Sequence, residues 1–475
     1  MIRYILLFSF CFSLPCLGEV RLPKVIGSNM VLQQESEIAI WGWADAGEAV
    51  TVTCDWLDRR FVTEADDAGK WTVSLKTRKA GGPHTLNISA SNRITLDNIL
   101  FGEVWLASGQ SNMEMPLVKV SGAYTAINNS EEEVAAANFP NIRLFQAGNY
   151  SSKEPLDDVQ QGIEMYGIPK AECKWNECSP RSIPHFASTA YFFARELHKR
   201  LKVPVGIIDA SWGGTSAEAW TPANGLKKLG YQSELEQAAT LPQQPEQKIP
   251  TRLYNGMIHP LRNFELKGVI WYQGEGNSGR ADKYCDLFST MIGEWRNVFD
   301  NQFPFYFAQI SPFNYSLNSA FLREAQFETL SLTKTGMAVT MDIGNLTDIH
   351  PKNKQEVGRR LALWALAKDY NRDIVFSGPL FKNAVFDDKR ARVSFEYTGS
   401  GLTTNDGKAP SHFELAGDDK VFHAANATIE GDQIVVVCDQ VDSPKAVRYA
   451  FSSQAMPNLI NQEGLPASSF RSDRW

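Results

Sequence analysis

The sequence predicts an α/β protein in which a parallel-sheet domain lies between two β-rich regions. Between about residues 98 and 370, apolar strand-like segments alternate with amphipathic helical segments. That alternation is typical of βαβ units and of a parallel sheet between two layers of helices. On both sides of this stretch, apolar and polar residues alternate at every second position, as in antiparallel strands. The most unusual polar motifs directly follow apolar segments, where sites form in open α/β sheets.

Length and composition limit the possible functions. A chain of 475 residues is too long for one ordinary core and suggests two or three domains. Its 43% hydrophobic and 21% charged residues are typical of a globular protein in water. The formal net charge of −7 argues against nucleic acid or an anionic membrane as a partner. The 12 tryptophans suit large cores and, where exposed, platforms for sugar rings.

The first 18 residues have the pattern of an export signal. Arg3 gives a positive start, Ile5 to Leu14 form an apolar run, and Cys16-Leu17-Gly18 offers small residues near a cleavage site. This run is too short to span a bilayer, and no other segment is long and apolar enough. We therefore expect a secreted or periplasmic protein without a membrane span.

The cysteines after residue 18 leave two possibilities open. They are Cys54, Cys173, Cys178, Cys285 and Cys438. Cys173 and Cys178 are close enough in sequence to form a disulfide in an oxidising compartment, or they are separate buried thiols. Neither paired CxxC motifs nor an HExxH motif occurs, so no metal site is expected.

Residues 19–97 predict a small N-terminal β-sandwich. Period-two segments run over Glu37–Trp43, Ala49–Cys54, Lys70–Leu75 and His84–Ala90. Turn residues such as Asp67-Ala68-Gly69 separate them.

Residues 98–370 predict a parallel-sheet α/β domain, and residues 371–475 predict a C-terminal β-rich region. The expected strands of the α/β domain are Ile142–Gln146, Val205–Ala210, Gly268–Tyr272, Phe305–Ile310 and Met337–Asp342. The expected helices are His185–Leu201, Tyr284–Phe299, Phe321–Thr333 and Lys352–Tyr370, with a surface insertion at 224–253. The C-terminal strands are expected at Arg392–Glu396, Gln433–Cys438 and Ala446–Phe451. The sequence does not say whether they pack on the N-terminal strands.

The run from Ala107 to Glu114 places Ser111 at a turn directly after an apolar segment. A serine hydroxyl becomes a nucleophile only when a neighbouring base takes its proton. The common serine-hydrolase elbow is GxSxG, but Gly109-Gln110-Ser111-Asn112-Met113 lacks the second glycine. The α/β-hydrolase interpretation therefore loses its main support.

Several stretches resemble the sialate O-acetylesterases, a branch of the SGNH (GDSL-like) hydrolases, over nearly the whole mature chain. They are VWLASGQSNMEMP, DASWGGTSAEAWTP, VIWYQGEGN, DIHPKNKQEVGRRLA and AVRYAFSSQAMPNLINQEGLPASSFR. The resemblance implies a three-layer SGNH-type α/β esterase domain and a serine esterase mechanism. It also implies that the enzyme needs neither a metal nor another cofactor.

The resemblance assigns the catalytic roles. Ser111 is the expected nucleophile, and its own amide belongs to the oxyanion hole. Gly214 is the expected second donor, with Gly213 as the alternative, and Asn277 supplies a side-chain donor. His350 is the expected base.

The residue that orients His350 is left open by the sequence. The superfamily commonly spaces its acid and histidine as DxxH, whereas this chain has Asp348-Ile349-His350. Asp348, Asp342 and a backbone carbonyl are the candidates. His259 is a rival for the role of base. His350-Pro351 is expected to begin a helix with proline at its first position.

Two further patterns in the sequence bear on ligand binding. Gly274 to Gly279 spell GxGxxG after a strand, but the acidic residue about 20 positions later, Glu294, lies inside an expected helix. The dinucleotide interpretation is therefore not favoured. Trp212, Trp271 and Arg323 are the candidate substrate-binding residues, and buried packing or a solvated surface is the competing interpretation.

The expected function is that of a carbohydrate O-acetylesterase, which hydrolyses acetyl esters on sugar hydroxyls through an acyl-enzyme. An acetylated sialic acid is the first candidate substrate, and plant hemicellulose such as xylan, xyloglucan or mannan is the alternative. The alternative to an enzyme is a carbohydrate-binding protein without catalytic activity. The presence of Ser111, Asn277 and His350 argues against it.

Overall fold

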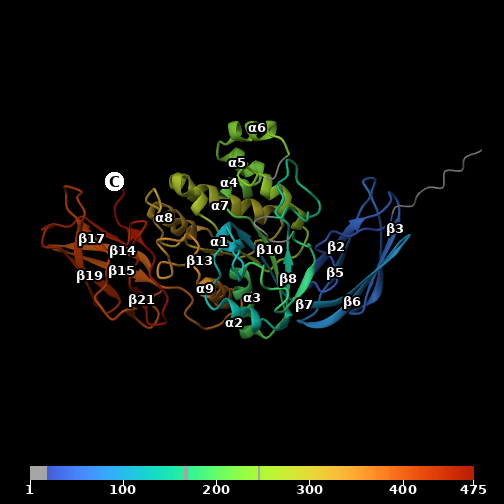
Figure 1. Ribbon diagram of the computed structural model, residues 1–475, viewed down its shortest axis with the longest axis horizontal. Helices are drawn as coiled ribbons and strands as arrows, with labels where there is room; N and C mark the ends of the chain where they lie inside the picture. The colour runs from blue at the N-terminus through green and yellow to red at the C-terminus, as the bar shows by residue number, and fades with distance from the viewer. Residues whose placement is uncertain (1–18, 165–169, 244–245) are drawn as a thin grey trace, which may run out of the picture.

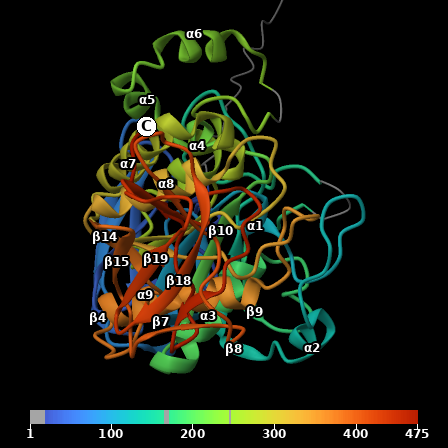
Figure 2. The same ribbon diagram turned by 90° about the vertical axis from the view of Figure 1, so that its left-hand side faces the viewer.

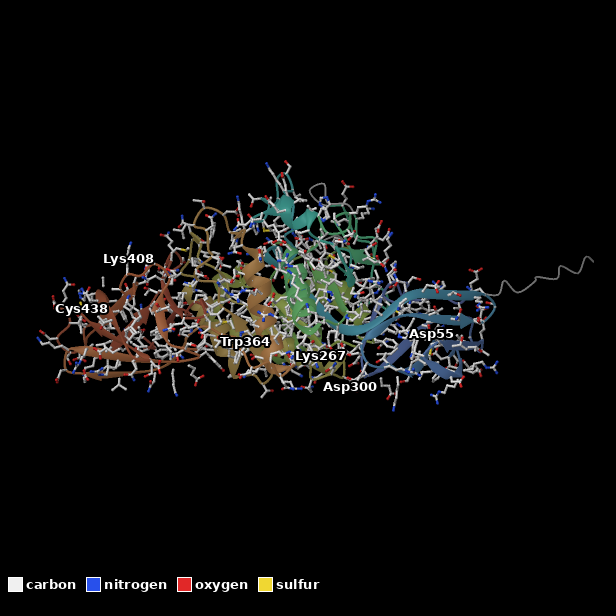
Figure 3. All side chains as sticks on the ribbon, turned by 90° about the horizontal axis from the view of Figure 1, so that it is seen from below. Asp55, Lys267, Asp300, Trp364, Lys408 and Cys438 are labelled. Atoms are coloured by element: carbon white, nitrogen blue, oxygen red, sulfur yellow. The ribbon has the colours of Figure 1, made fainter. Side chains whose placement is uncertain are left out.

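The computed structural model describes residues 19–164, 170–243 and 246–475, and the expected signal peptide (1–18) lies outside the described residues. A central α/β part carries a β-rich region on each of two opposite sides (Figure 1). Figure 3 shows Asp55 in the N-terminal region and Lys408 and Cys438 at the other end, in the C-terminal region. The C-terminal strands therefore pack on the central part and not on the N-terminal strands.

The central part is built on a parallel sheet. Its strands are β7 (Arg93–Gly109), β8 (Phe139–Gln146), β10 (Val205–Ser211), β11 (Gly268–Tyr272), β12 (Phe305–Ala308) and β13 (Thr335–Ala338), and β9 (Trp175–Cys178) pairs antiparallel with β8. The order is β13-β12-β11-β7-β10-β8-β9. From β7 the chain passes to β8 and β10 on one side and then crosses to β11, β12 and β13 on the other. Ligand sites form at such a reversal, outside the carboxyl ends of the strands.

Alternate residues of these strands enter two separate cores. Trp105 and Ala107 of β7 pack with α3 (Ser188–Leu201) and α9 (Lys354–Lys368). Val104 and Leu106 belong to the other core, with α7 (Ala281–Val298). Helices therefore cover both faces, which explains why these strands read as continuous apolar runs. The predicted α/β class with a β-rich C-terminal region is confirmed.

Strand β7 joins the N-terminal region to the central part. It is 17 residues long; its first half pairs with β6 (Gly81–Ser89) and β1 (Val31–Gln33), and its second half pairs with β10 and β11. The expected domain boundary between residues 97 and 98 falls inside this strand. The other N-terminal strands are β2 (Glu37–Trp43), β3 (Ala49–Cys54), β4 (Leu57–Glu64) and β5 (Lys70–Lys76).

The C-terminal region is antiparallel. Its larger sheet holds β14 (Leu380–Asp387), β15 (Arg390–Glu396), β19 (Gln433–Val437), β18 (His423–Glu430), β17 (Phe413–Ala416), β20 (Ala446–Tyr449) and β22 (Phe470–Arg471), and β16 (Leu402–Thr404) pairs with β21 (Leu459–Asn461). It contacts α8 (Ala320–Glu328) of the central part, where Arg471 lies 2.9 Å from Glu324.

The remaining helices are short. They are α1 (Ser111–Glu114), α2 (Ser130–Ala135), α4 (Ala217–Trp220), α5 (Ala223–Lys228) and α6 (Gln232–Thr240). The segment expected as a surface insertion contains α5 and α6, and α6 stands out from the central part in both ribbon views (Figures 1 and 2). Within the described ranges, the helices all fall short of the length and apolarity needed to cross a bilayer.

Two expectations receive an answer. The five cysteines of the described residues are free thiols, so Cys173 and Cys178 are not bridged. Helix α9 begins at Lys354, and the prediction of a start at Pro351 is wrong. The side chain of Asn353 caps the helix by accepting a hydrogen bond from the amide of Glu356, which satisfies a free donor of the first turn.

Gly109 offers a test of the strand end that precedes Ser111. Its φ is +138°, and a Cβ there would lie 2.2 Å from the carbonyl oxygen of Tyr272 on β11. We expect Gly109→Ala to destabilise the protein by more than the roughly 1–3 kcal/mol of backbone strain alone, because β7 and β11 must also separate. Thermal unfolding compared with Gly122→Ala checks this, because Gly122 has φ of +79° and open space around it. Equal losses in the two variants would contradict the expectation.

Candidate active site

The carboxyl ends of the central strands bring the predicted site segments together. Ser111 follows β7, Gly213 and Gly214 follow β10, and Asn277 follows β11. His350 lies in the loop between β13 and α9. These are the segments that meet beside the point where the winding of the sheet reverses.

Ser111 is the first residue of the four-residue helix α1. It is partly exposed. Neither its hydroxyl nor its amide N–H has a hydrogen-bond partner among the described residues, and a free N–H is expected in the first turn of a helix. The loop after β10 lies close by, because a Cβ on Gly213 would be 3.3 Å from the Cβ of Ser111.

The two adjacent glycines after β10 differ in what their amides do. The N–H of Gly213 donates to Oε2 of Glu114 over 2.7 Å. In the described ranges, the N–H of Gly214 has no acceptor. The φ of +72° at Gly214 is readily adopted by glycine. Gly214 is therefore the member of the pair with an available donor.

Asn277 is buried and held on three sides. Its Oδ1 accepts from the amide of Ala217 over 2.9 Å and from Gln273 over 2.8 Å. Its Nδ2 donates to Oε2 of Glu218 over 2.9 Å, which leaves its second hydrogen for another acceptor. Burial raises the pKa of Glu218, but the bond from Asn277 and the charge of Arg280 outweigh burial and hold that pKa below its usual value.

His350 lies beside Asp348. Its Nδ1 is 3.5 Å from Oδ1 of Asp348, and the same oxygen accepts the backbone N–H of His350 over 2.9 Å. The other carboxylate oxygen accepts from the hydroxyl of Thr125 over 3.2 Å. Burial, together with the nearby charge of Lys354, lowers the pKa of His350 to about 4. The imidazole is therefore neutral at physiological pH, as a base must be.

The rival candidates for the acid and the base lie elsewhere. Asp342 receives two bonds of 2.7 Å from the guanidinium of Arg360, a bidentate pair. The Nδ1 of His259 lies 2.9 Å from the carbonyl oxygen of Leu156. The geometry thus places Asp348, and not Asp342, next to His350.

The three candidate substrate-binding side chains are in the interior. Trp271 is fully buried in the core that contains α7, and Trp212 is 1% exposed. Arg323 is also fully buried, and it donates to the carbonyl oxygen of Ser452 over 2.5 Å and to the hydroxyl of Ser469 over 3.1 Å. Arg323 therefore links α8 to the C-terminal region, and the described conformation leaves none of the three side chains open to a ligand.

Asn112, which sequence reasoning did not single out, connects the segments around Ser111. Its Nδ2 donates to Oε1 of Glu275 over 2.5 Å and to the carbonyl oxygen of Ile349 over 3.1 Å. Its Oδ1 accepts from the buried ammonium group of Lys354. Burial lowers the pKa of Lys354 to about 7 and raises the pKa of Glu275. One amide thus holds the turn after β11 and the loop that carries His350.

Comparisons with known proteins identify the family of this chain. The family model of carbohydrate esterases described as sialic acid-specific acetylesterases matches residues 102–367. The chain belongs to this family. The sialate O-acetylesterase of Mus musculus is 30% identical over 424 residues, which cover 76% of each chain. The human sialate O-acetylesterase is 30% identical over 399 residues, 76% of this chain and 73% of its own.

A solved structure is similar over almost the whole chain. It is the crystal structure of a carbohydrate acetylesterase from Xanthomonas citri, with a TM-score of 0.86 and 38% identity. The similarity covers 96% of this chain and 100% of that one. It therefore includes both β-rich regions as well as the central part.

Glu114 is a second residue that sequence reasoning missed, although it stands three positions after Ser111 on α1. Its carboxylate accepts from the N–H of Gly213 over 2.7 Å, from the hydroxyl of Tyr124 over 2.6 Å and from Asn149 over 2.7 Å. The ring of Tyr124 meets the ring of His350 edge to face, with centroids 5.1 Å apart. Glu114 thus fixes the loop of Gly214 and supports the position of His350.

We expect Glu114→Ala to lower kcat by roughly 10²-fold, the cost of a site misplaced by about 1 Å. Glu114→Gln keeps an oxygen for Gly213 and Tyr124 and should recover most of the activity. Steady-state kinetics on an acetyl ester, with thermal unfolding to confirm folding, provides the measurement. Equal activity of folded Ala and Gln variants would show that the carboxylate does not position the loop.

Proposed function

We propose that this protein is a serine esterase that removes acetyl groups from the hydroxyls of a carbohydrate. The observation that carries the proposal is that Ser111, Gly214 and Asn277 follow the neighbouring strands β7, β10 and β11, and that the loop of His350 is bound to the same turn through Asn112, in a chain of the acetylesterase family. A hydroxyl, a neutral imidazole and several available N–H donors form the set that acyl transfer requires. We assign the central part to the three-layer SGNH class on the same grounds.

The proposed reaction has two halves. His350 takes the proton of Ser111 as the serine oxygen attacks the acetyl carbonyl. The amides of Ser111 and Gly214 and the side chain of Asn277 stabilise the negative charge on the carbonyl oxygen. The C–O bond to the sugar then breaks, the sugar oxygen takes the proton from His350, and acetyl-Ser111 remains. A water molecule that gives its proton to His350 attacks this ester, His350 returns that proton to the serine oxygen, and acetate and free Ser111 are released.

Asp348 orients and stabilises His350 in this scheme. The carboxylate lies on the Nδ1 side of the ring, which leaves Nε2 as the atom that takes the serine proton in this scheme. Serine and histidine are often farther apart without substrate than in the complex with it. The absence of a Ser111 hydrogen bond in the described residues is therefore compatible with the proposed role.

Two substrate classes remain candidates. Relatives named sialate O-acetylesterase favour an acetylated sialic acid. The more similar carbohydrate acetylesterase, which aligns over nearly the full length, is named for no particular sugar, so an acetylated hemicellulose such as xylan, xyloglucan or mannan is the second candidate. The sequence of residues 1–18 supports export to the periplasm or medium, where either substrate is met.

The first test is acetate release from O-acetylated sialic acid and from acetylated hemicellulose. We expect wild-type protein to release acetate from one of them and Ser111→Ala to lose about 10⁶-fold in kcat. Ser108→Ala is the matched control, because the hydroxyl of Ser108 only donates to the carbonyl oxygen of Ala210. No acetate from either substrate with wild type would favour a carbohydrate-binding protein without activity.

The dependence of kcat/KM on pH tests the role of His350. The neutral imidazole is the active form, so activity should rise with pH through about 4, where this buried histidine titrates. An unperturbed histidine would place that rise near 6.5. Asp348→Asn should move the acid limb to still lower pH, because the carboxylate raises the pKa. It should also reduce kcat by up to about 10⁴-fold. An acid limb that stays in place in this variant would contradict the pairing of Asp348 with His350.

A further inference from the structure

A cavity of about 220 Å³ lies where the N-terminal region meets the central part, away from the residues described above. Its walls come from β2 and β5 and from the segments around residues 157 and 262 of the central part. Strands β2 and β5 lie on the side of the N-terminal region that faces the central part (Figure 1). The cavity therefore opens between two structural units, a common location for ligand sites.

Three tryptophans form the apolar walls of this cavity. Trp41 and Trp43 stand on one face of β2, and Trp71 belongs to β5. Gly42 between them has no side chain, and a Cβ there would lie 3.0 Å from the ring of Trp71. Trp43 is partly exposed, whereas Trp41 is 7% exposed and Trp71 is 3% exposed. Trp43 is thus the most exposed ring of the three, and the guanidinium of Arg21 lies 5.8 Å from the centroid of that ring.

Planar polar side chains complete the cavity. Asp157 accepts from Lys70 over 2.8 Å and from Arg262 over 2.7 Å. The exposed side chains of Asp66 and Asn263 also line it. Within the described ranges, Oδ2 of Asp66 and the amide of Asn263 have no hydrogen-bond partner. They are free to bind hydroxyl groups.

The charges in the cavity balance. Two carboxylates, Asp66 and Asp157, face two cations, Lys70 and Arg262, and Asp157 already engages both cations. A ligand with a negative charge would find no cation without a partner among these residues. The lining instead suits an uncharged molecule with one apolar face and several hydroxyls, which describes a neutral pyranose unit.

One segment connects this cavity with the active site. Asn149 donates to Glu114, and eight positions later Asp157 lines the cavity. Eight residues span roughly 29 Å at most, which limits the distance between the two places. An oligosaccharide can extend over that distance, so one glycan chain can occupy both.

We propose that the cavity bounded by Trp43, Asp66, Asp157 and Asn263 is a binding subsite for a neutral sugar unit of a polymeric substrate. This proposal depends on the proposed function in one respect: the bound glycan is taken to carry the acetyl ester that the active site hydrolyses. Binding itself requires no catalysis. The subsite would thus favour acetylated neutral polysaccharides over free acetylated sialic acid.

Binding to the full-length Ser111→Ala protein tests the subsite without catalysis. The probes are xylotetraose, cellotetraose and mannotetraose, with N-acetylneuraminic acid as the charged comparison, and the readouts are calorimetry and tryptophan fluorescence. We expect at least one neutral tetrasaccharide to bind, and Trp43→Ala or Asn263→Ala to weaken that binding at least tenfold. Trp475→Ala is the control, because Trp475 is 45% exposed in the C-terminal region.

Steady-state kinetics of the same variants in an enzyme that keeps Ser111 provides a second test. Trp43→Ala should raise KM on acetylated polysaccharide at unchanged kcat, and leave hydrolysis of p-nitrophenyl acetate unchanged. Asn263→Ala, which changes only an exposed side chain, keeps the test valid if Trp43→Ala does not fold. Loss of activity on the small ester as well would mean that Trp43 serves folding, and absence of binding by all three tetrasaccharides would overturn the subsite. Binding by an enzyme that releases no acetate would retain the subsite and reject the esterase.

Discussion

The arrangement of the site depends on the side-chain amide of Asn112. This amide uses both of its N–H donors and its oxygen: the donors bind Glu275 and Ile349, and the oxygen accepts from Lys354. Only a carboxamide offers donors and an acceptor in so small a group. The three partners belong to the turn after β11, the loop before α9 and α9 itself. Removal of one partner from such a buried charged network typically costs about 3–5 kcal/mol, because another charge is left unpaired.

Helix α1 has too few residues to be stable by itself. A helix of four residues forms scarcely any of its own hydrogen bonds, and isolated helices much longer than this are marginal in water. The polar contacts of two of its side chains therefore determine its position: Asn112 binds the segments on one side, and Glu114 binds the loop of Gly213 on the other. Ser111 lies on the same short helix, so its place relative to Gly214 and His350 follows from these contacts.

Much of this could be predicted from the sequence because the local patterns agree with the final environment. The periodicities of β2, β3 and β11 gave the observed bounds, since each strand alternates or is wholly buried as its residues suggest. The continuity of β7 across both regions could not be predicted from its own residues. Its first half pairs with β6 of the N-terminal region and its second half with β10 of the central part, and neither pairing is visible in the sequence of β7.

The choice among similar residues also needed the structure. Asp342 and Asp348 look alike in sequence, and what separates them is Arg360 on α9, which binds Asp342. Arg323 looks like a surface residue on a helix until the C-terminal region covers it and Ser452 accepts its hydrogen bond. In both cases the deciding partner belongs to another structural element. Asn112 and Glu114 stand within the serine motif itself, but their partners also lie in other elements, so their roles needed the structure too.

The electrostatics of the site follow from the same burial that fixes its geometry. Lys354 is buried among Asn112, Glu275 and the ring of Tyr272, and its charge lies close enough to lower the pKa of His350. A cation near a catalytic histidine disfavours the imidazolium, and Asp348 opposes that effect from the other side. The positive charge that His350 gains during acyl transfer is therefore stabilised mainly by Asp348. Burial lowers the pKa of Lys354 to about 7. As the pH rises past this value, Lys354 loses its positive charge and no longer disfavours the imidazolium of His350. The network that positions the nucleophile thus also sets how strongly the base holds its proton.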